Sequence, residues 1–180
     1  YEAVKKQTAF IIRKSVEIYE LSEKIRKDYH NTAYLSTLVK GCTENAKDIT
    51  EGGAELNFVT IEGVCFATTI DSILAVKHLV YDTGEYTLVQ LVSALKNNWK
   101  GQDIMRAKAL NKCPKYGQDN DEADEIARDY MNFFSTETWK YRTKSTNRQF
   151  RPGMLSWNYW ASAGFILPAS PNGRKQGEFF

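Results

Sequence analysis

Apolar residues recur at helical spacing over most of the chain, and the longest such run lies near its N-terminal end. Val4, Ile11, Ile18 and Ile25 are seven residues apart, which is two helical turns, so they share one face of a helix predicted over residues 3–28. Thr68 and Asp71 form a predicted capping box before an apolar helix. Further segments are expected to be helical at 34–46, 73–80, 87–97, 102–111 and 121–134, and extended at 55–60.

The segment from residue 154 to residue 167 follows a different period. Residues 155, 157, 159, 161, 163 and 165 are apolar, and the alternate set is Ser156, Asn158, Trp160 and Ser162. A period of two predicts a strand with one face on packed helices and the other on a polar space, and Gly164 is expected to bend or end it. Many helices with few strands favour a mostly helical part of an α/β barrel over a helical bundle.

Composition restricts the class of protein. The chain has 180 residues, is 42% hydrophobic and carries a formal net charge of +2, so it can bury one domain-sized core and has no global attraction to nucleic acid or an anionic membrane. No run approaches the roughly 18 apolar residues of a membrane span, and the first residues lack a signal-peptide layout. We therefore expect a cytoplasmic protein with no membrane partner.

Candidate metal ligands are few. Cys42, Cys65 and Cys113 are irregularly spaced, which favours free thiols in a reducing cytoplasm, and only His30 and His78 could join them. The acidic run at 119–125 lacks the glycine and the final glutamate of a calcium loop, and it fits the first turn of a helix better. We therefore expect no metal site.

A basic stretch at 139–151 leaves two interpretations open. It contains no acid, and Trp139, Tyr141 and Phe150 are interleaved with its cations, as in a nucleic-acid or phosphate site. The alternative, which the balanced charge elsewhere favours, is a solvated basic loop. A non-catalytic module that binds an anion or nucleic acid therefore stays a second hypothesis. The five cations are Lys140, Arg142, Lys144, Arg148 and Arg151.

Four motifs, in this order, resemble those of the glycyl radical enzymes, the group of pyruvate formate-lyase, diol and glycerol dehydratases and choline lyase. The resemblance covers about residues 35–178. Glu55, Leu56 and Asn172 depart from the family pattern, which leaves the subgroup open. The motifs are D-I-T-E-G-G-A running to Asn57 at 48–57, A-T-T-I-D-S-I-L-A-V-K-H-L-V at 67–80, P-K-Y-G-Q-D at 114–119, and G-x-x-x-x-A-x-P-N-G-R at 164–174.

The resemblance implies a segment of a ten-stranded α/β barrel, with residues 1–180 forming an incomplete part of a single barrel domain that lacks the glycine-radical domain. In such enzymes an activase that uses S-adenosylmethionine and an iron–sulfur cluster creates a glycine radical, which passes to a cysteine that abstracts hydrogen from a small-molecule substrate. Both radical residues are expected outside this chain, which therefore has no catalytic residue or cofactor of its own and is inactive alone. The full-length protein is expected to form a homodimer.

Gly41-Cys42-Thr43-Glu44 has the form of the family's thiyl loop, G-C-x-E. However, Cys42 lies only ten residues before Gly52-Gly53 and within a helical pattern, whereas the family's catalytic cysteine comes far earlier. We therefore expect Cys42 to be a structural residue.

The resemblance also suggests a reaction and a substrate site. The expected function is that of a dehydratase-type C–O or C–N lyase, with pyruvate formate-lyase (formate C-acetyltransferase) as the alternative. The family's strand before the fourth motif helps to line the substrate cavity, which makes Asn158, Trp160 and Ser162 candidate substrate-binding residues. Packing of this face against other barrel strands is the competing interpretation.

Overall fold

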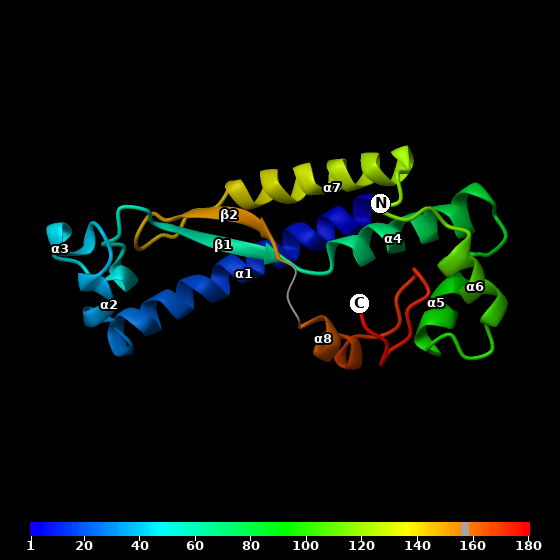
Figure 1. Ribbon diagram of the computed structural model, residues 1–180, viewed down its shortest axis with the longest axis horizontal. Coiled ribbons are helices and arrows are strands. Elements are labelled where there is room, and N and C mark those ends of the chain that lie inside the picture. The colour runs from blue at the N-terminus through cyan, green and yellow to red at the C-terminus, as the bar shows by residue number, and fades with distance from the viewer. Residues whose placement is uncertain (156–158) are drawn as a thin grey trace. The chain divides into compact units, whose positions relative to one another are not determined.

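The computed structural model describes residues 1–155 and 159–180, which form two compact units. Unit 1 contains Tyr1–Glu62 and Met131–Gly153, and unit 2 contains Gly63–Tyr130 and Met154–Phe180. The elements run in the order α1 (Glu2–Tyr29), α2 (Ala33–Thr37), α3 (Cys42–Asn45), β1 (Phe58–Gly63), α4 (Phe66–Val76), α5 (Leu88–Lys96), α6 (Asp103–Asn111), α7 (Asp121–Trp139), β2 (Gln149–Met154) and α8 (Trp160–Ile166), as Figure 1 shows.

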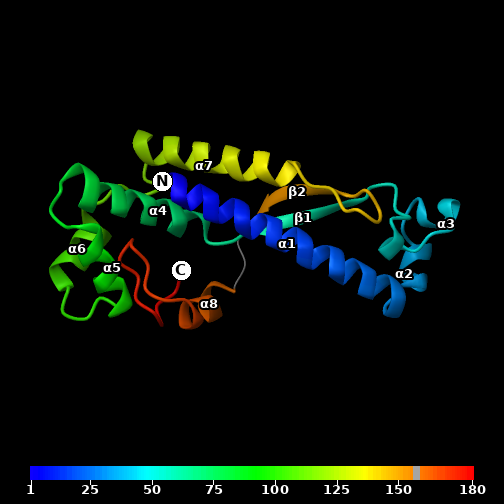
Figure 2. The same ribbon diagram turned by 180° about the vertical axis from the view of Figure 1, so that it is seen from behind.

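In unit 1, α1 lies along a sheet of two parallel strands, β1 and β2 (Figure 2). Val16 of α1, Val59 of β1 and Phe150 of β2 form the buried cluster between them, and the ring of Tyr19 meets Phe150 edge-on at a centroid distance of 5.6 Å. The long helix predicted over residues 3–28 is confirmed. The face that it buries against the sheet is not the one marked by the heptad of Val4, Ile11, Ile18 and Ile25.

The first motif forms a compact loop beside the helix predicted over residues 34–46. That helix is interrupted, because Gly41 adopts a φ of +95° and a Cβ there would lie 2.5 Å from the amide nitrogen of Glu55. Asp48 stabilises this loop by accepting hydrogen bonds from the Thr32 amide (3.0 Å), the Ser36 hydroxyl (2.7 Å) and the Thr50 amide (2.8 Å). The motif therefore has a structural role.

In unit 2, α4 supplies side chains to two separate clusters. Ile70 and Leu74 pack on Ala123 and Ala127 of α7, whereas Ala75 and Leu79 contact the core around α5 and α6. The helix continues past Val76 as a π-helical turn, Lys77–Asp82. Two helices, α5 and α6, match the predictions for 87–97 and 102–111, and Thr87 caps α5 with Gln90 in a capping box.

The capping box predicted at Thr68 and Asp71 is wrong. Helix α4 begins at Phe66, two residues before Thr68, with Cys65 as its N-cap in a left-handed conformation (φ 60°, ψ 37°). Thr68 and Asp71 therefore lie inside the helix. The apolar residues from Ile73 onward form only the later part of a longer helix. Its first turn, Phe66-Ala67-Thr68-Thr69, has no strong period of apolar residues, so the pattern did not indicate it.

The strand predicted over residues 154–167 is also wrong, because β2 ends at Met154 and residues 160–166 form the helix α8. Helix α8 buries two consecutive residues, Ala163 and Gly164, which a strand would point to opposite faces. A Cβ on Gly164 would lie 2.4 Å from the carbonyl oxygen of Glu178, so its missing side chain lets the C-terminal segment approach. Alanine favours helices, and the apparent period of two arose from Ala161 and Ala163 alternating with other residues.

No helix within residues 1–155 and 159–180 is both long and apolar enough to cross a membrane.

Candidate functional site

A groove of about 530 Å³ lies in unit 2, at the N-terminal end of α4. The first turn of α4 forms one side, and Met154, Leu155 and Trp160 line it from the segment that leads into α8. Its walls are largely apolar, and the polar groups on them are few, as in many small-molecule sites. The full lining is Gly63, Val64, Cys65, Phe66, Ala67, Thr68, Tyr116, Met154, Leu155, Trp160 and Phe180.

The second and third motifs meet at this groove. The amide of Tyr116 donates a hydrogen bond of 2.9 Å to the carboxylate of Asp71 in α4, and Lys115 lies 3.9 Å from the same carboxylate. The rings of Phe66 and Tyr116 meet edge-on with centroids 5.4 Å apart. The P-K-Y-G loop is therefore held against α4, and it presents the Tyr116 ring to the groove.

The fourth motif holds the segment after α8 together. Arg174 is buried, and its guanidinium donates to the main-chain carbonyls of Pro168, Lys175 (2.9 Å) and Glu178 (3.1 Å). It also lies 3.9 Å from the centroid of the Phe180 ring, which lines the groove. The Oδ1 atom of Asn172 accepts from Ser170 (2.7 Å), so the asparagine that replaces the family's aspartate supplies the same kind of acceptor.

Cys65 is the one thiol on the groove wall of the described chain. Burial raises the pKa of this thiol above its usual value, and the positive charge of Arg174 lowers it less. The thiol is therefore neutral near pH 7 and a poor nucleophile. It contributes a small apolar surface.

The three predicted substrate-binding residues have different positions. Trp160 lines the groove, and its ring packs edge-on against Phe179 at 4.8 Å between centroids. Ser162 is exposed on the first turn of α8 and donates to the carbonyl of Tyr159 (3.2 Å), away from the groove lining. Asn158 lies outside the described residues. The reason for grouping them, a shared strand face, is wrong, and their role in binding substrate stays a prediction.

Cys65, Phe66 and Tyr116 also line the groove, and the patterns of the sequence did not indicate them. Tyr116 lies within the third motif, and Cys65 and Phe66 immediately precede the second. The motifs could therefore have indicated these positions. Their convergence depends on the long-range contact with Asp71, for which periodicity carries no signal.

Cys42 lies in unit 1, on the four-residue helix α3, and is buried with 3% of its surface exposed. The carboxylate of Glu44 does not face a reaction site, because it accepts a hydrogen bond of 2.9 Å from the amide of Gly41. These contacts support the structural role expected of Cys42.

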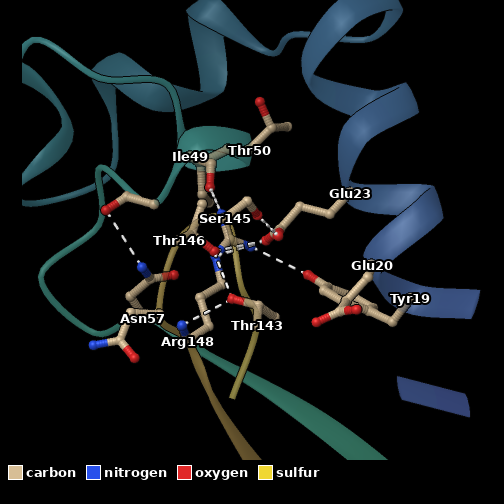
Figure 3. A network of polar contacts seen from close by, with 12 residues as sticks. Tyr19, Glu20, Glu23, Ile49, Thr50, Asn57, Thr143, Ser145, Thr146 and Arg148 are labelled. Carbon is tan, nitrogen blue, oxygen red and sulfur yellow. Dashed lines mark hydrogen bonds and ion pairs between the residues drawn. The ribbon is translucent and has the colours of Figure 1, made fainter. Parts of the chain in front are cut away.

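The basic stretch at 139–151 is engaged by partners within unit 1. Arg148 is buried and pairs with the buried Glu23 (3.4 Å), while its guanidinium also donates to Tyr19 (3.2 Å) and to the carbonyl of Ile49, as Figure 3 shows. Lys144 lies 3.4 Å from Glu20. Of the other cations, Lys140 pairs with Glu137, Arg142 donates to the carbonyl of Asn147 (3.0 Å), and Arg151 lies 4.2 Å from the Phe58 ring centroid.

A second cavity, of about 550 Å³, adjoins this network. Its charged lining has both signs, since four lysines face four acids across it, and Lys27 pairs with Glu51 at 3.1 Å. A site for a nucleic acid or a phosphate would need an excess of free cations. The geometry therefore favours a self-neutralised surface over the anion-binding alternative. The lysines are Lys24, Lys27, Lys47 and Lys144, and the acids are Glu20, Glu23, Asp28 and Glu51.

Within the residues that the structure describes, no group of three or more histidines, cysteines or acids is placed to hold a metal ion.

Comparison with known proteins places this arrangement in a family. Residues 1–162 match the Pyruvate formate lyase-like family. The chain is 35% identical over 174 residues to trans-4-hydroxy-L-proline dehydratase of Clostridioides difficile, covering 97% of this chain and 22% of that protein. It is 32% identical over 146 residues to (2S)-3-sulfopropanediol dehydratase of Klebsiella oxytoca, covering 81% of this chain and 18% of that protein.

A solved structure gives the same picture for the fold. The glycerol-bound B12-independent glycerol dehydratase of Clostridium butyricum superposes with a TM-score of 0.90 at 30% identity, over 99% of this chain and 22% of that one. The expectation of a mostly helical segment of a pyruvate formate-lyase-type α/β barrel is thereby confirmed. The chain spans about a fifth of the length of the relatives it matches. It belongs to the pyruvate formate lyase-like family.

Proposed function

We propose that this chain supplies barrel scaffold and one wall of the substrate cavity in an anaerobic glycyl radical lyase of the dehydratase type. The observation that carries this proposal is the groove of unit 2, where residues at or beside the second and third motifs meet Trp160. The buried Arg174 of the fourth motif supports the Phe180 side of the same groove. Residues 1–180 are, in this proposal, part of a single barrel domain.

The chemistry of the groove suits a passive wall. Its thiol is neutral, and the nearby carboxylate of Asp71 is occupied by Tyr116 and Lys115. A radical reaction needs a site that orients the substrate and excludes water, because a stray radical reacts with its surroundings. Aromatic side chains such as Trp160, Tyr116 and Phe66 provide rigid, apolar surface for that purpose.

The reacting groups belong to other parts of a family-length protein in this proposal. The rest of the protein supplies the thiyl cysteine and the glycine that carries the radical, and a radical S-adenosylmethionine activase with an iron–sulfur cluster installs that radical. The full-length protein acts as a homodimer in the cytoplasm. Dehydration, with cleavage of a C–O bond, is preferred to C–N cleavage and to formate acetyltransfer, because the three relatives named above are all called dehydratases.

A chimera tests the role of Trp160. This chain replaces the matching segment of the Clostridioides difficile trans-4-hydroxy-L-proline dehydratase, and turnover of trans-4-hydroxy-L-proline is measured after activation. Trp160→Ala is expected to lower kcat/KM at least about tenfold, since it removes the largest side chain of the groove wall. Ile166→Ala, at an exposed position on the same helix and away from the groove lining, is the matched control and should leave kcat/KM within about twofold.

Two results would contradict the proposal. One is a Trp160→Ala chimera with unchanged kcat/KM and unchanged preference between hydroxyproline and smaller diols. The other is equal loss in the Trp160 and Ile166 variants, which would show that α8 matters only for folding.

A further inference from the structure

Tyr116 carries a hydroxyl group without a partner in its own unit. The residue lines the groove of unit 2 and is 40% exposed. Within the part of the chain that the structure describes, its hydroxyl makes no hydrogen bond, whereas its main-chain amide is bound to Asp71. A phenolic hydroxyl can both donate and accept a hydrogen bond. The residue is therefore anchored through its main chain and has a free polar group at the end of its side chain.

Contacts within unit 2 hold the Tyr116 ring in place. Its amide donates to the carboxylate of Asp71 (2.9 Å), and its ring meets Phe66 edge-on at a centroid distance of 5.4 Å. The preceding residue is fixed as well, because the ammonium of Lys115 donates to the carbonyl of Ala109 (2.9 Å). A polar group that is already positioned loses little conformational entropy when it binds a ligand. The hydroxyl of Tyr116 is preorganised in this sense.

The surroundings of this hydroxyl select the kind of group that it can bind. Among the described residues, none of those that line the groove carries a charge. Arg174 lies behind the ring of Phe180, and its guanidinium donates to main-chain carbonyls. A carboxylate or phosphate on this wall would lose water without gaining a counter-charge, whereas a neutral hydroxyl needs only one hydrogen-bonding partner. The wall therefore suits an uncharged oxygen.

The other polar side chains on the wall are less suited to this contact. Trp160 can only donate, and its ring is packed against Phe179 at 4.8 Å between centroids. The thiol of Cys65 is a weak donor. Thr68 has a hydroxyl, but its short side chain keeps that group close to the first turn of α4. Tyr116 combines a longer reach with a fixed base.

We propose that Tyr116 is a specificity-determining residue, whose hydroxyl forms a hydrogen bond with a neutral hydroxyl group of the substrate. This inference rests on the proposed function, since it requires that the groove is one wall of the substrate cavity. It adds the chemical group that this wall recognises, and it assigns to Tyr116 a polar role besides its apolar surface.

The test is a binding cycle in the chimera with the Clostridioides difficile dehydratase, left unactivated so that the ligand is not consumed. Isothermal titration calorimetry gives the Kd for trans-4-hydroxy-L-proline and for L-proline, which lacks the hydroxyl. Tyr116→Phe removes only the phenolic oxygen and keeps the ring against Phe66. Tyr81→Phe, at a position 69% exposed and away from the groove lining, is the matched control. Glycerol binding to the corresponding chimera with the Clostridium butyricum glycerol dehydratase is the second setting.

Tyr116→Phe is expected to weaken the binding of hydroxyproline and of glycerol at least about fivefold, as for the loss of one hydrogen bond, and to leave the Kd for L-proline within about twofold. The thermal midpoint should not change, and neither should the affinities of the Tyr81→Phe control. Unchanged affinity for both hydroxyproline and glycerol would overturn the inference. An equal loss for L-proline or a lowered thermal midpoint would overturn it too, because the hydroxyl of Tyr116 would then act on another group or on the fold.

Trp160→Ala, measured beside these variants, separates this inference from the proposed function. If Trp160→Ala weakens binding and Tyr116→Phe does not, the inference about Tyr116 fails and the groove remains a wall of the substrate cavity. If neither substitution weakens binding, or if neither parent chimera binds its ligand, the groove is not such a wall and both proposals fail.

Discussion

Glu23→Ala removes the carboxylate at the centre of the polar network of unit 1. Glu23 is 3% exposed, and its carboxylate accepts from the hydroxyls of Ser145 and Thr146 (2.8 Å) and pairs with Arg148. The substitution leaves a buried guanidinium without a counter-charge. Breaking a buried ion pair on one side typically costs about 3–5 kcal/mol.

The contacts around Arg148 narrow the expected loss of unfolding free energy. Arg148 keeps two acceptors, the Tyr19 hydroxyl and the Ile49 carbonyl, which places its desolvation cost near the lower limit. The Ser145 and Thr146 hydroxyls lose an acceptor, at about 1 kcal/mol for a neutral hydrogen bond, although Thr146 keeps its contact with Thr143 (2.8 Å). We expect the free energy of unfolding to fall by about 3–4 kcal/mol.

Urea denaturation followed by circular dichroism measures this loss, and a double-mutant cycle identifies its cause. Arg148→Met alone leaves Glu23 buried and unpaired, so it should be as harmful. The combination of Glu23→Ala with Arg148→Met should lose at least about 1–2 kcal/mol less than the sum of the two single changes. Glu17→Ala, which removes a half-exposed partner of Lys14, is the control and should leave the free energy of unfolding nearly unchanged.

The reasoning is refuted if Glu23→Ala costs less than about 1 kcal/mol. It is also refuted if the two single changes add without coupling, because the carboxylate and the guanidinium would then not depend on each other.

Three further predictions concern other contacts. Burial raises the pKa of Asp48, but hydrogen bonds from Thr50, Ser36 and Thr32 outweigh it and lower the pKa from 3.8 to about 2; because the folded-state pKa is the lower one, Asp48→Asn should cost about 1–2 kcal/mol above pH 4, with the difference shrinking as the pH falls below 4 and disappearing below about pH 2. Urea titrations of both proteins at pH 7 and pH 2 check this, and an equal gap at both values would contradict it. Gly53→Ala should lower the thermal midpoint more than Gly84→Ala, since a Cβ on Gly53 would lie 2.1 Å from the Lys47 carbonyl oxygen, whereas one on Gly84 meets nothing within 4 Å and carries only the backbone strain of a φ of +63°; a smaller loss for Gly53→Ala would be evidence against this contact. Arg174→Lys should expose residues 164–180 to proteolysis, because an ammonium cannot reproduce the planar fork that reaches several carbonyls. Mass spectrometry of chymotryptic digests measures it, with Lys175→Gln as the control and unchanged cleavage rates as the contrary result.

The long helices could be predicted from sequence because their information is local. Helix α1 follows from its spacing of apolar residues, and α5 from the Thr87–Gln90 capping box. The interruption of the helix at Gly41 could not be predicted. The residue that requires it, Glu55, is fourteen positions away and approaches Gly41 only in the folded loop. The spacing of residues near Gly41 gives no information about a contact with a residue so far along the chain.

Only part of the candidate site could be predicted, because its residues meet through contacts between distant positions. Trp160 was identified from an alternation that does not correspond to the structure, yet it lines the groove. Alanine and aromatic residues fit both a helix and a strand, so residues 160–166 could not be assigned from their period. The glycine at 164 is required by the close approach of the Glu178 backbone, which the local pattern does not show. The groove itself arises from the contact between Asp71 and Tyr116, forty-five residues apart.

The π-helical turn after α4 has a consequence for how the chain tolerates changes in length. Leu74 faces the cluster with α7 and Leu79 faces the cluster with α5 and α6, and Lys77–Asp82 lies at the junction. Deleting one residue there would restore an ordinary helical turn and rotate everything after it by about 100°. Leu79 would then leave its cluster. Insertions and deletions should therefore be far rarer at 77–82 than in the open turn around Gly84, although both lie at the end of the same helix.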